Sequence, residues 1–151
     1  MSTRGSRPAD VRRILICSGK IYTDLVASDH RASRPDVAIC RLEQLYPVPM
    51  RDLRTALEAY AKATEIVWVQ EEPENMGAWD FVRPHLFEVS GGRTVRYVAR
   101  PRSASPAEGS AARHAVTQQA LVNEAFAPYE RDDSSVARKA RRDSQLTSSK
   151  G

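Results

Sequence analysis

A stretch near the middle of the chain decides the fold: Trp68-Val69-Gln70-Glu71-Glu72-Pro73-Glu74-Asn75-Met76-Gly77-Ala78-Trp79. Two apolar residues, Ile66 and Val67, precede it, so an apolar strand runs into a loop of carboxylates and then into a helix with a second tryptophan. Residues 14–17 and 37–40 are also continuous apolar runs, without the alternation of a strand that has one wet face. We therefore expect three buried parallel strands.

Segments with helical spacing separate these strands. Leu53, Ala56, Leu57 and Tyr60 recur at i, i+3, i+4 and i+7, as on one face of a helix. Residues 20–30, 77–87 and 114–126 are predicted to be further helices and residues 94–98 a fourth strand. The alternation predicts an α/β fold, a three-layer α/β/α sandwich with a mostly parallel sheet.

Each predicted helix has an apolar side. We expect Tyr22, Leu25 and Val26 to face inward from the first, Trp79, Val82 and Phe87 to be among the apolar residues of the third, and Gln118, Leu121, Val122 and Ala125 to line one side of the last. Pro84 is expected to kink or shorten the third helix.

The composition predicts one compact domain with unstructured ends. The 151 residues are 41% hydrophobic and 28% charged, which is ordinary for a globular protein. We expect a flexible N-terminus over residues 1–11, a folded domain over residues 12–127, and a charged, disordered tail over residues 128–151, where basic and acidic side chains mix. The net charge of +4 does not indicate nucleic acid, because the basic residues are spread and lack interleaved aromatic residues.

The chain shows no signal for a membrane or for export. No apolar run approaches the roughly 18 residues of a membrane span, and residues 1–13 lack the apolar stretch of a secretory signal. A soluble intracellular protein is expected. Cys17 and Cys40 each end an apolar run and lack the spacing of a metal or redox pair, so buried reduced thiols are favoured over a disulfide. Three histidines without a His-Glu-x-x-His pattern give no indication of zinc.

Two groups of residues are candidates for binding an anion. The turn Ser18-Gly19-Lys20 follows a strand and opens a helix, so its N–H groups and Lys20 could hold a phosphate or carboxylate; an ordinary strand-to-helix turn is the favoured alternative. Arg100, Arg102 and Arg113 flank a loop of small residues, which could close over a phosphate or dock on a neighbouring domain. His114 is interpreted as a structural histidine rather than a base.

Polar residues gather where two of the predicted strands end, the edge at which open α/β sheets bind ligands. They are Glu71, Glu72, Glu74 and Asn75 after one strand, and Glu43, Gln44 and Tyr46 after another. General acid, general base or metal-ligand roles are chemically conceivable for the carboxylates. Helix capping and contact with a partner are favoured, and we therefore predict an interface there. Tyr46, Trp68 and Trp79 could equally be core residues.

Four motifs in order carry a resemblance to a known family: residues 18–22, 41–47, 70–79 and 100–106, followed by His114, Gln118 and Gln119. Over residues 12–126 the chain resembles the carboxy-terminal domain of 2-oxoglutarate dehydrogenase, the thiamine-diphosphate-dependent first component of its complex. It departs from that family at Ala99, where glycine is common, and in the charged tail.

The resemblance implies a fold of the transketolase carboxy-terminal type and a supporting role in a tricarboxylic acid cycle enzyme. In the family, upstream domains hold thiamine diphosphate and magnesium, and the enzyme decarboxylates 2-oxoglutarate and transfers a succinyl group to lipoyl-lysine. The resemblance does not extend to those domains, so alone this chain is expected to bind no cofactor or metal, to supply no catalytic residue and to be inactive. Its expected partners are the thiamine-binding domains or a homodimer mate, in the cytoplasm, or in the mitochondrial matrix of a eukaryote.

Two other interpretations remain open. The chain could be a free regulatory module that binds an acyl-CoA or a nucleotide through Lys20, Arg100, Arg102 and Arg113. A weaker alternative makes the tail a tether to nucleic acid or a scaffold. No membrane partner is expected.

Overall fold

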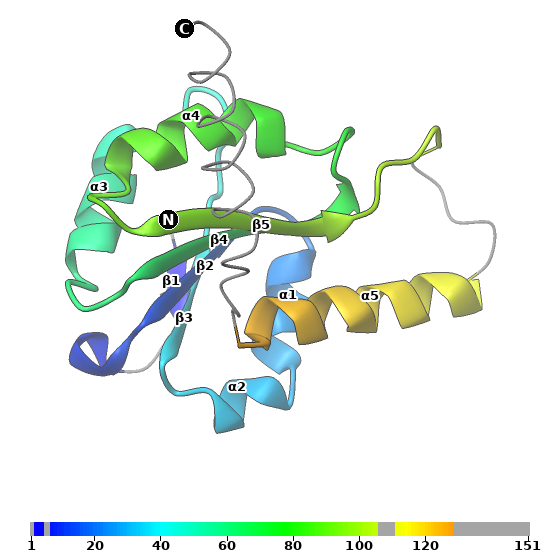
Figure 1. The fold of residues 1–151 in the computed structure, drawn as a ribbon, viewed down its shortest axis with the longest axis horizontal. Coiled ribbons are helices and arrows are strands. Elements are labelled where there is room, and N and C mark those ends of the chain that lie inside the picture. Colours follow the sequence, from blue (N-terminus) through cyan, green and yellow to red (C-terminus); the bar gives the residue numbers. More distant parts are fainter. Residues whose placement is uncertain (1, 5–6, 106–110, 129–151) are drawn as a thin grey trace, which may run out of the picture.

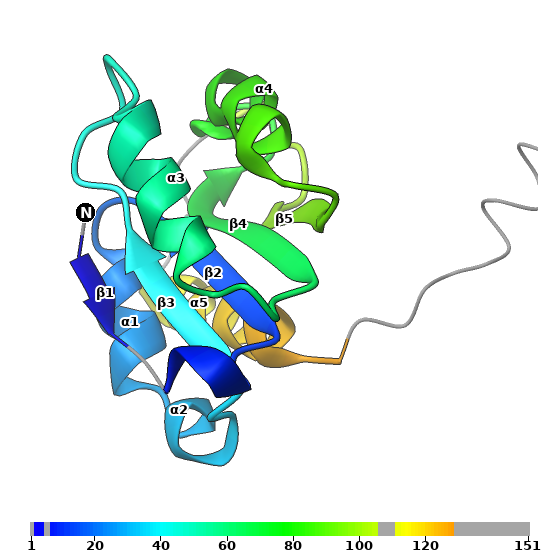
Figure 2. The ribbon, with the colours of Figure 1, turned by 90° about the vertical axis from the view of Figure 1, so that its left-hand side faces the viewer.

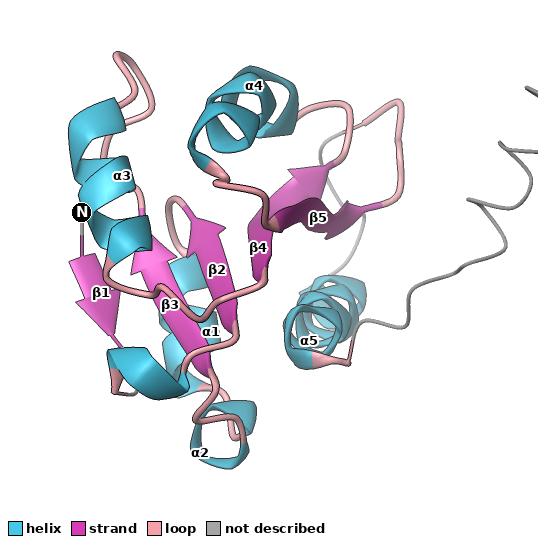
Figure 3. Ribbon diagram, turned by 60° about the vertical axis from the view of Figure 1, so that its left-hand side comes forward, coloured by secondary structure: helices cyan, strands magenta, loops and turns pink. Residues whose placement is uncertain are grey.

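The computed structural model describes residues 2–4, 7–105 and 111–128, and these residues form a five-stranded sheet with helices on both faces (Figures 1 and 3). The strands are β1 (Ser2–Arg4), β2 (Arg13–Cys17), β3 (Val37–Arg41), β4 (Glu65–Pro73) and β5 (Thr94–Arg100), in the spatial order β1-β3-β2-β4-β5. Strands β2 to β5 are parallel to one another, and β1 pairs antiparallel with β3. The predicted mostly parallel sheet is confirmed.

The helices form the two outer layers. Helices α3 (Met50–Glu58) and α4 (Trp79–Val89) cover one face, while α1 (Ile21–Ala27), α2 (His30–Ser33) and α5 (Ala111–Phe126) lie on the other side (Figure 3). A short 3-10 helix, Pro8–Asp10, precedes β2. The three-layer sandwich is therefore confirmed, and none of the helices in the described part of the chain is long and apolar enough to cross a membrane.

The central strands are buried on both faces, which is why their sequences do not alternate. In β2, Ile14 and Ile16 pack with α3 and α4, while Leu15 and Cys17 pack with α1 and α5. Trp68 of β4 is fully buried on the α3 and α4 side. One core on each side of the sheet therefore holds the layers together.

The helices largely match the predicted segments. Leu25 is buried, and Tyr22 and Val26 pack partly against the same core, as predicted. The helix expected over residues 20–30 ends earlier, at Ala27, and the short helix α2 begins at His30. Helix α4 is not shortened at Pro84 and continues to Val89.

Two short elements lie within residues 1–11, which were expected to be flexible. Strand β1 continues the sheet beyond β3, with Ser2 opposite Arg41, and the 3-10 helix follows it. The predicted charged tail lies outside the described residues, apart from Pro128.

A buried ion cluster lies at the amino ends of β2 and β4. Arg13 is 4% exposed and Glu65 is 8% exposed, and the Nε atoms of Arg13 and Arg96 each donate to one oxygen of the Glu65 carboxylate. Burial lowers the pKa of Arg13, while the Glu65 carboxylate opposes that shift. An unpaired charge at this depth would raise the free energy of the folded state, and the pairing of Arg13 and Arg96 with Glu65 offsets that cost.

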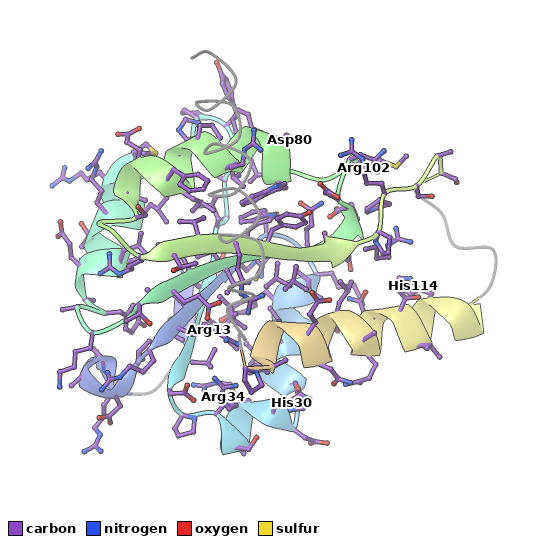
Figure 4. The ribbon with its side chains drawn as sticks, in the orientation of Figure 1. Arg13, His30, Arg34, Asp80, Arg102 and His114 are labelled. Atoms are coloured by element: carbon purple, nitrogen blue, oxygen red, sulfur yellow. The ribbon has the colours of Figure 1, made fainter. Side chains whose placement is uncertain are left out.

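The same cluster holds the end of α5. Arg13 Nη1 donates to the carbonyl of Ala125 at 3.0 Å and to that of Ala127 at 2.6 Å, and Arg34 Nη1 donates to the carbonyl of Phe126. Figure 4 shows both arginines beside the carboxyl end of this helix. They satisfy carbonyls that a helix leaves unpaired at its end, where positive charge is also favoured.

On the opposite face, Arg93 ties together the ends of two helices. Its Nε donates to the Ala63 carbonyl at 3.1 Å, and its two Nη atoms donate to the Ser90 and Leu57 carbonyls at 2.9 and 3.2 Å. One guanidinium thus connects the segments that follow α3 and α4 to the start of β5.

Removing the shared charge of the ion cluster should destabilise the fold. Glu65→Gln leaves the buried Arg13 and the half-buried Arg96 without their carboxylate and is expected to lower the free energy of unfolding by about 3 kcal/mol. Glu88→Gln is the matched control, because Glu88 pairs with Arg54 at the surface and its loss should cost less than about 1 kcal/mol. Urea unfolding measures both, and equal losses would contradict the role given to Glu65.

The two cysteines are free and fully buried, as predicted. They lie on opposite faces of the sheet. Burial is the main cause that raises the pKa of Cys17 and of Cys40 to about 12, from an ordinary value of 9.0. Both thiols are therefore neutral, inert core groups.

The raised thiol pKa values make stability depend on pH above 9. Between pH 9 and 12 the unfolded thiols lose protons that the folded thiols keep, so the free energy of unfolding falls as pH rises, by at most about 1.4 kcal/mol per pH unit for each thiol. Urea unfolding at pH 8 and pH 10 should show a larger loss for the native chain than for a Cys17→Ala/Cys40→Ala variant. Equal losses would show that the thiols are not responsible.

Candidate functional site

The loop between β4 and α4 is organised by one buried side chain amide, that of Gln70. Its Oε1 accepts hydrogen bonds from Trp68 Nε1 at 2.9 Å and from the Trp79 backbone N–H at 3.0 Å. Its Nε2 donates to the Pro73 carbonyl at 3.0 Å. The amide therefore satisfies the first tryptophan of the motif and a free N–H at the start of α4, and it fixes the loop between them.

Gly77 is required because the Gln70 amide lies against it. A Cβ atom at position 77 would overlap the nitrogen, oxygen and carbon of that amide. The backbone of Gly77 is not in the left-handed region that favours glycine. The need for glycine here therefore comes from the close approach of the amide. Gln70 and Gly77 therefore depend on each other, because the amide occupies the space that a side chain at position 77 would need.

The acidic part of the loop is bound to the segment that follows β5. Arg100 Nε donates to the Glu71 carbonyl at 2.7 Å. Arg102 Nη1 lies 3.5 Å from Glu74 Oε1. The pKa of Tyr97 is raised, first by burial and then by its hydrogen bond to Glu74. Two of the predicted anion-binding arginines therefore contact acidic-loop residues of the same domain.

Asn75 completes this attachment. Its Nδ2 donates to the Ser103 carbonyl at 3.0 Å, and its Oδ1 accepts from the Ser103 N–H at 3.1 Å. This paired contact resembles the pairing of two strands, and it holds the loop after β5 against the loop after β4. The helix-capping role considered for Asn75 is not observed, since α4 begins at Trp79.

The predicted turn at residues 18–20 lies beside a polar chain of contacts between α1, α5 and β4. Lys20 Nζ lies 3.3 Å from Asp24 Oδ2. The Nε2 of Gln118 donates to the same Asp24 oxygen at 2.7 Å and to Glu71 Oε2 at 3.2 Å. Gly19 has a φ of 71°, in the left-handed region where glycine is favoured.

An open groove of about 620 Å³ lies between α1, α2 and α5. Lys20, Asp24, Asp29, His30, His114 and Gln118 are among the residues that line it. Both signs of charge are present, so the lining does not select an anion. Figure 4 shows Arg102 and His114 apart, and Arg100 and Arg102 do not line the groove. The side chain of Arg113 lies outside the described part of the chain, and the anion site stays a prediction.

The other half of the predicted interface follows β3. Glu43 Oε2 lies 3.2 Å from Arg41 Nε, without the geometry of a hydrogen bond. Gln44 Nε2 donates to the Pro47 carbonyl at 2.9 Å. Tyr46 is 84% exposed, so its interpretation as a core residue was wrong, whereas Trp68 and Trp79 are core residues.

The structure adds residues to this surface that the sequence did not single out. The Tyr46 and Phe81 rings lie 6.4 Å apart between centroids, and the His85 ring meets Phe81 edge-on at 5.6 Å. Phe81 was detectable as an aromatic residue outside the inward stripe of α4, which consists of Trp79, Val82, Leu86 and Val89. Phe87, counted among the apolar residues of this helix, is 55% exposed.

Metal-ligating side chains do not gather in the described residues. No group of three or more histidine, cysteine, aspartate or glutamate residues among them is arranged to hold a metal ion. His114 is exposed and is one of the residues that line the groove.

A double-mutant cycle tests the fit between Gln70 and Gly77. Gly77→Ala should lower the free energy of unfolding by about 1–3 kcal/mol, because the new methyl group overlaps the amide. In a Gln70→Ala background the same substitution should cost clearly less, since the overlap is gone. Urea unfolding of the four proteins gives the coupling energy. Additive costs would show that Gly77 is needed for another reason.

Comparison with known proteins identifies the family of this loop and fold. The family model described as 2-oxoglutarate dehydrogenase C-terminal matches residues 2–126, which include β1. The 2-oxoglutarate dehydrogenase E1 component of Cupriavidus necator is 48% identical over 118 residues, which are 78% of this chain and 12% of the relative. That of Haemophilus influenzae is 47% identical over 121 residues, which are 79% of this chain and 13% of the relative.

A relative with a different name matches to the same extent. A multifunctional 2-oxoglutarate metabolism enzyme of Mycobacterium is 46% identical over 120 residues, which are 78% of this chain and 10% of the relative. The chain thus spans only 10–13% of the length of these relatives. Because the family model covers both cores, the sheet and the Gln70 loop, the chain belongs to the 2-oxoglutarate dehydrogenase C-terminal family.

Proposed function

We propose that this chain is the non-catalytic carboxy-terminal domain of a 2-oxoglutarate dehydrogenase first component, and that it supports assembly with the thiamine-binding domains of that enzyme. The observation that carries the proposal is the family match over residues 2–126, combined with relatives of which the chain spans only 10–13%. A domain of this size within a much longer polypeptide has a surface that packs against the rest.

The arrangement of polar groups supports a structural role. At the carboxyl edge, Gln70 and Asn75 hold loops together, and Glu71 accepts a hydrogen bond from Gln118. Thiamine diphosphate is held in proteins together with magnesium, which prefers several oxygen ligands. We propose, from the family resemblance, that both cofactors are held by other domains of the enzyme, and we derive no chemical step in this one.

The proposal fixes the partners and the place of action. The partner is the thiamine-binding part of the same enzyme or a homodimer mate, and the reaction served is the decarboxylation of 2-oxoglutarate with transfer of the succinyl group in the tricarboxylic acid cycle. The protein would act in the cytoplasm of a bacterium, or in the mitochondrial matrix if its source is eukaryotic.

Replacement of the matched segment in a relative tests this role. In the Cupriavidus necator E1 component, deletion of the 118 matched residues should abolish 2-oxoglutarate-dependent decarboxylation. Insertion of residues 2–126 of this chain in their place should restore at least about a tenth of the activity, because close homologues keep the packing of a domain. The control is the same chimera with Glu65→Gln, which should be less stable.

If the E1 component keeps its oligomeric state and its activity after the deletion, the segment has no supporting role. A pull-down of the tagged chain from its native lysate, followed by mass spectrometry, provides an independent test and should recover thiamine-binding domains. Failure to recover them, together with saturable binding of an acyl-CoA or nucleotide, would favour the regulatory module.

A further inference from the structure

An aromatic cluster of the exposed Tyr46 and Phe81 and the half-buried His85 lies at the carboxyl edge of the sheet. Tyr46 comes from the loop after β3, and the other two residues come from α4, so the cluster joins segments far apart in the sequence. Phe81 is 42% exposed and Tyr46 is almost fully so. Large aromatic side chains in contact with one another at a surface are typical of protein interfaces.

The position of the cluster follows from the packing of α4 on α3. Phe81, His85 and Glu88 lie at i, i+4 and i+7 on one flank of α4. Glu88 pairs with Arg54 of α3, so this flank runs along the seam between the two helices, which lie side by side in Figure 2. An ion pair covers one part of the seam. The part nearer the start of α4 has the aromatic cluster instead.

The backbone beneath the cluster is fixed. The Oε1 of Gln70 accepts from the first N–H of α4, two residues before Phe81. On the other side, the Gln44 side chain bonds to the Pro47 carbonyl, and Leu45 and Val48 pack against the core on both sides of Tyr46. Surface aromatic residues held in this way lose little conformational freedom on binding, which is a property of interface hot spots.

Part of the polar half of the same edge is already bonded to the domain itself. The segment after β5 lies over the acidic loop through the Asn75–Ser103 and Arg102–Glu74 contacts. The Tyr46 and Phe81 rings add exposed apolar surface beside exposed polar residues such as Glu43 and Glu72. This apolar surface is available to another protein surface without breaking a contact of that kind.

We infer that the aromatic cluster of Tyr46, Phe81 and His85 is the contact through which this domain docks into an apolar pocket on the remaining part of the E1 polypeptide. The inference rests on the proposed function and names the surface that performs it. The occupant follows from length: the matched segment is only 10–13% of each relative, so most of each relative's chain lies outside it. An apolar pocket fits because covering aromatic rings requires no charge to be desolvated.

The test uses Tyr46→Ser and Phe81→Ser in the Cupriavidus necator chimera, with Phe87→Ser as the matched control. Phe87 is on the same helix and is 55% exposed, but it is outside the cluster. The first readout is the rate of limited proteolysis at the junction before the inserted domain, which reports the undocked population. Each cluster variant should raise that rate at least about tenfold, as expected for hot-spot residues, and Phe87→Ser should change it less than about threefold.

The second readout separates undocking from unfolding and from failure of the proposed function. Urea unfolding of the full 151-residue chain should give the same midpoint for all three variants. If the parent chimera is active but the cluster variants are cleaved no faster than Phe87→Ser, the docking surface is elsewhere and the proposed function stands. If the parent chimera and the pull-down both fail, the proposed function fails. Loss of a dimer of the isolated chain in Tyr46→Ser, with no change in the chimera, would replace the inference with self-association.

Discussion

Burial of β4 on both faces is the constraint on which the rest of the structure depends. Its residues from Ile66 to Val69 are fully buried, so polar groups are restricted to the two ends of the strand. At the amino end Glu65 pairs with Arg13 and Arg96, and at the carboxyl end Gln70 bonds to its own loop. Each end then positions a helix. The Arg13 cluster holds the end of α5, and the Gln70 amide holds the start of α4.

Much of the fold was predictable because a buried parallel strand has a simple signature. The continuous apolar runs located β2, β3 and β4, and helical spacing located α3. Strand β1 was not predictable in the same way, because its sequence, Ser2, Thr3 and Arg4, contains no apolar residue that would mark a buried strand. Arg13 and Glu65 were also missed, since a charged residue before an apolar run is usually read as exposed.

Part of the candidate site was predictable from the topology of parallel strands. The carboxyl ends of parallel strands lie at one edge, so the placement of the Glu71 loop near the start of α1 and the loop after β5 follows from topology. The internal pairing of this edge depends on side chain geometry that periodicity does not describe. The amide of Gln70 against Gly77 and the Asn75–Ser103 pairing are contacts of this kind.

The division of this edge into a polar half and an aromatic half explains how it can act as an interface. Glu71 and Asp24 already accept hydrogen bonds from Gln118, and Asp24 is also paired with Lys20. A ligand or partner that used these groups would have to break contacts inside the domain and desolvate charges, which costs free energy before any is gained. Contact with the Tyr46 and Phe81 rings does not carry this cost, because covering the rings removes exposed apolar surface from water. The polar half therefore gives the edge its fixed shape, and in the proposed interface the aromatic half would supply the affinity.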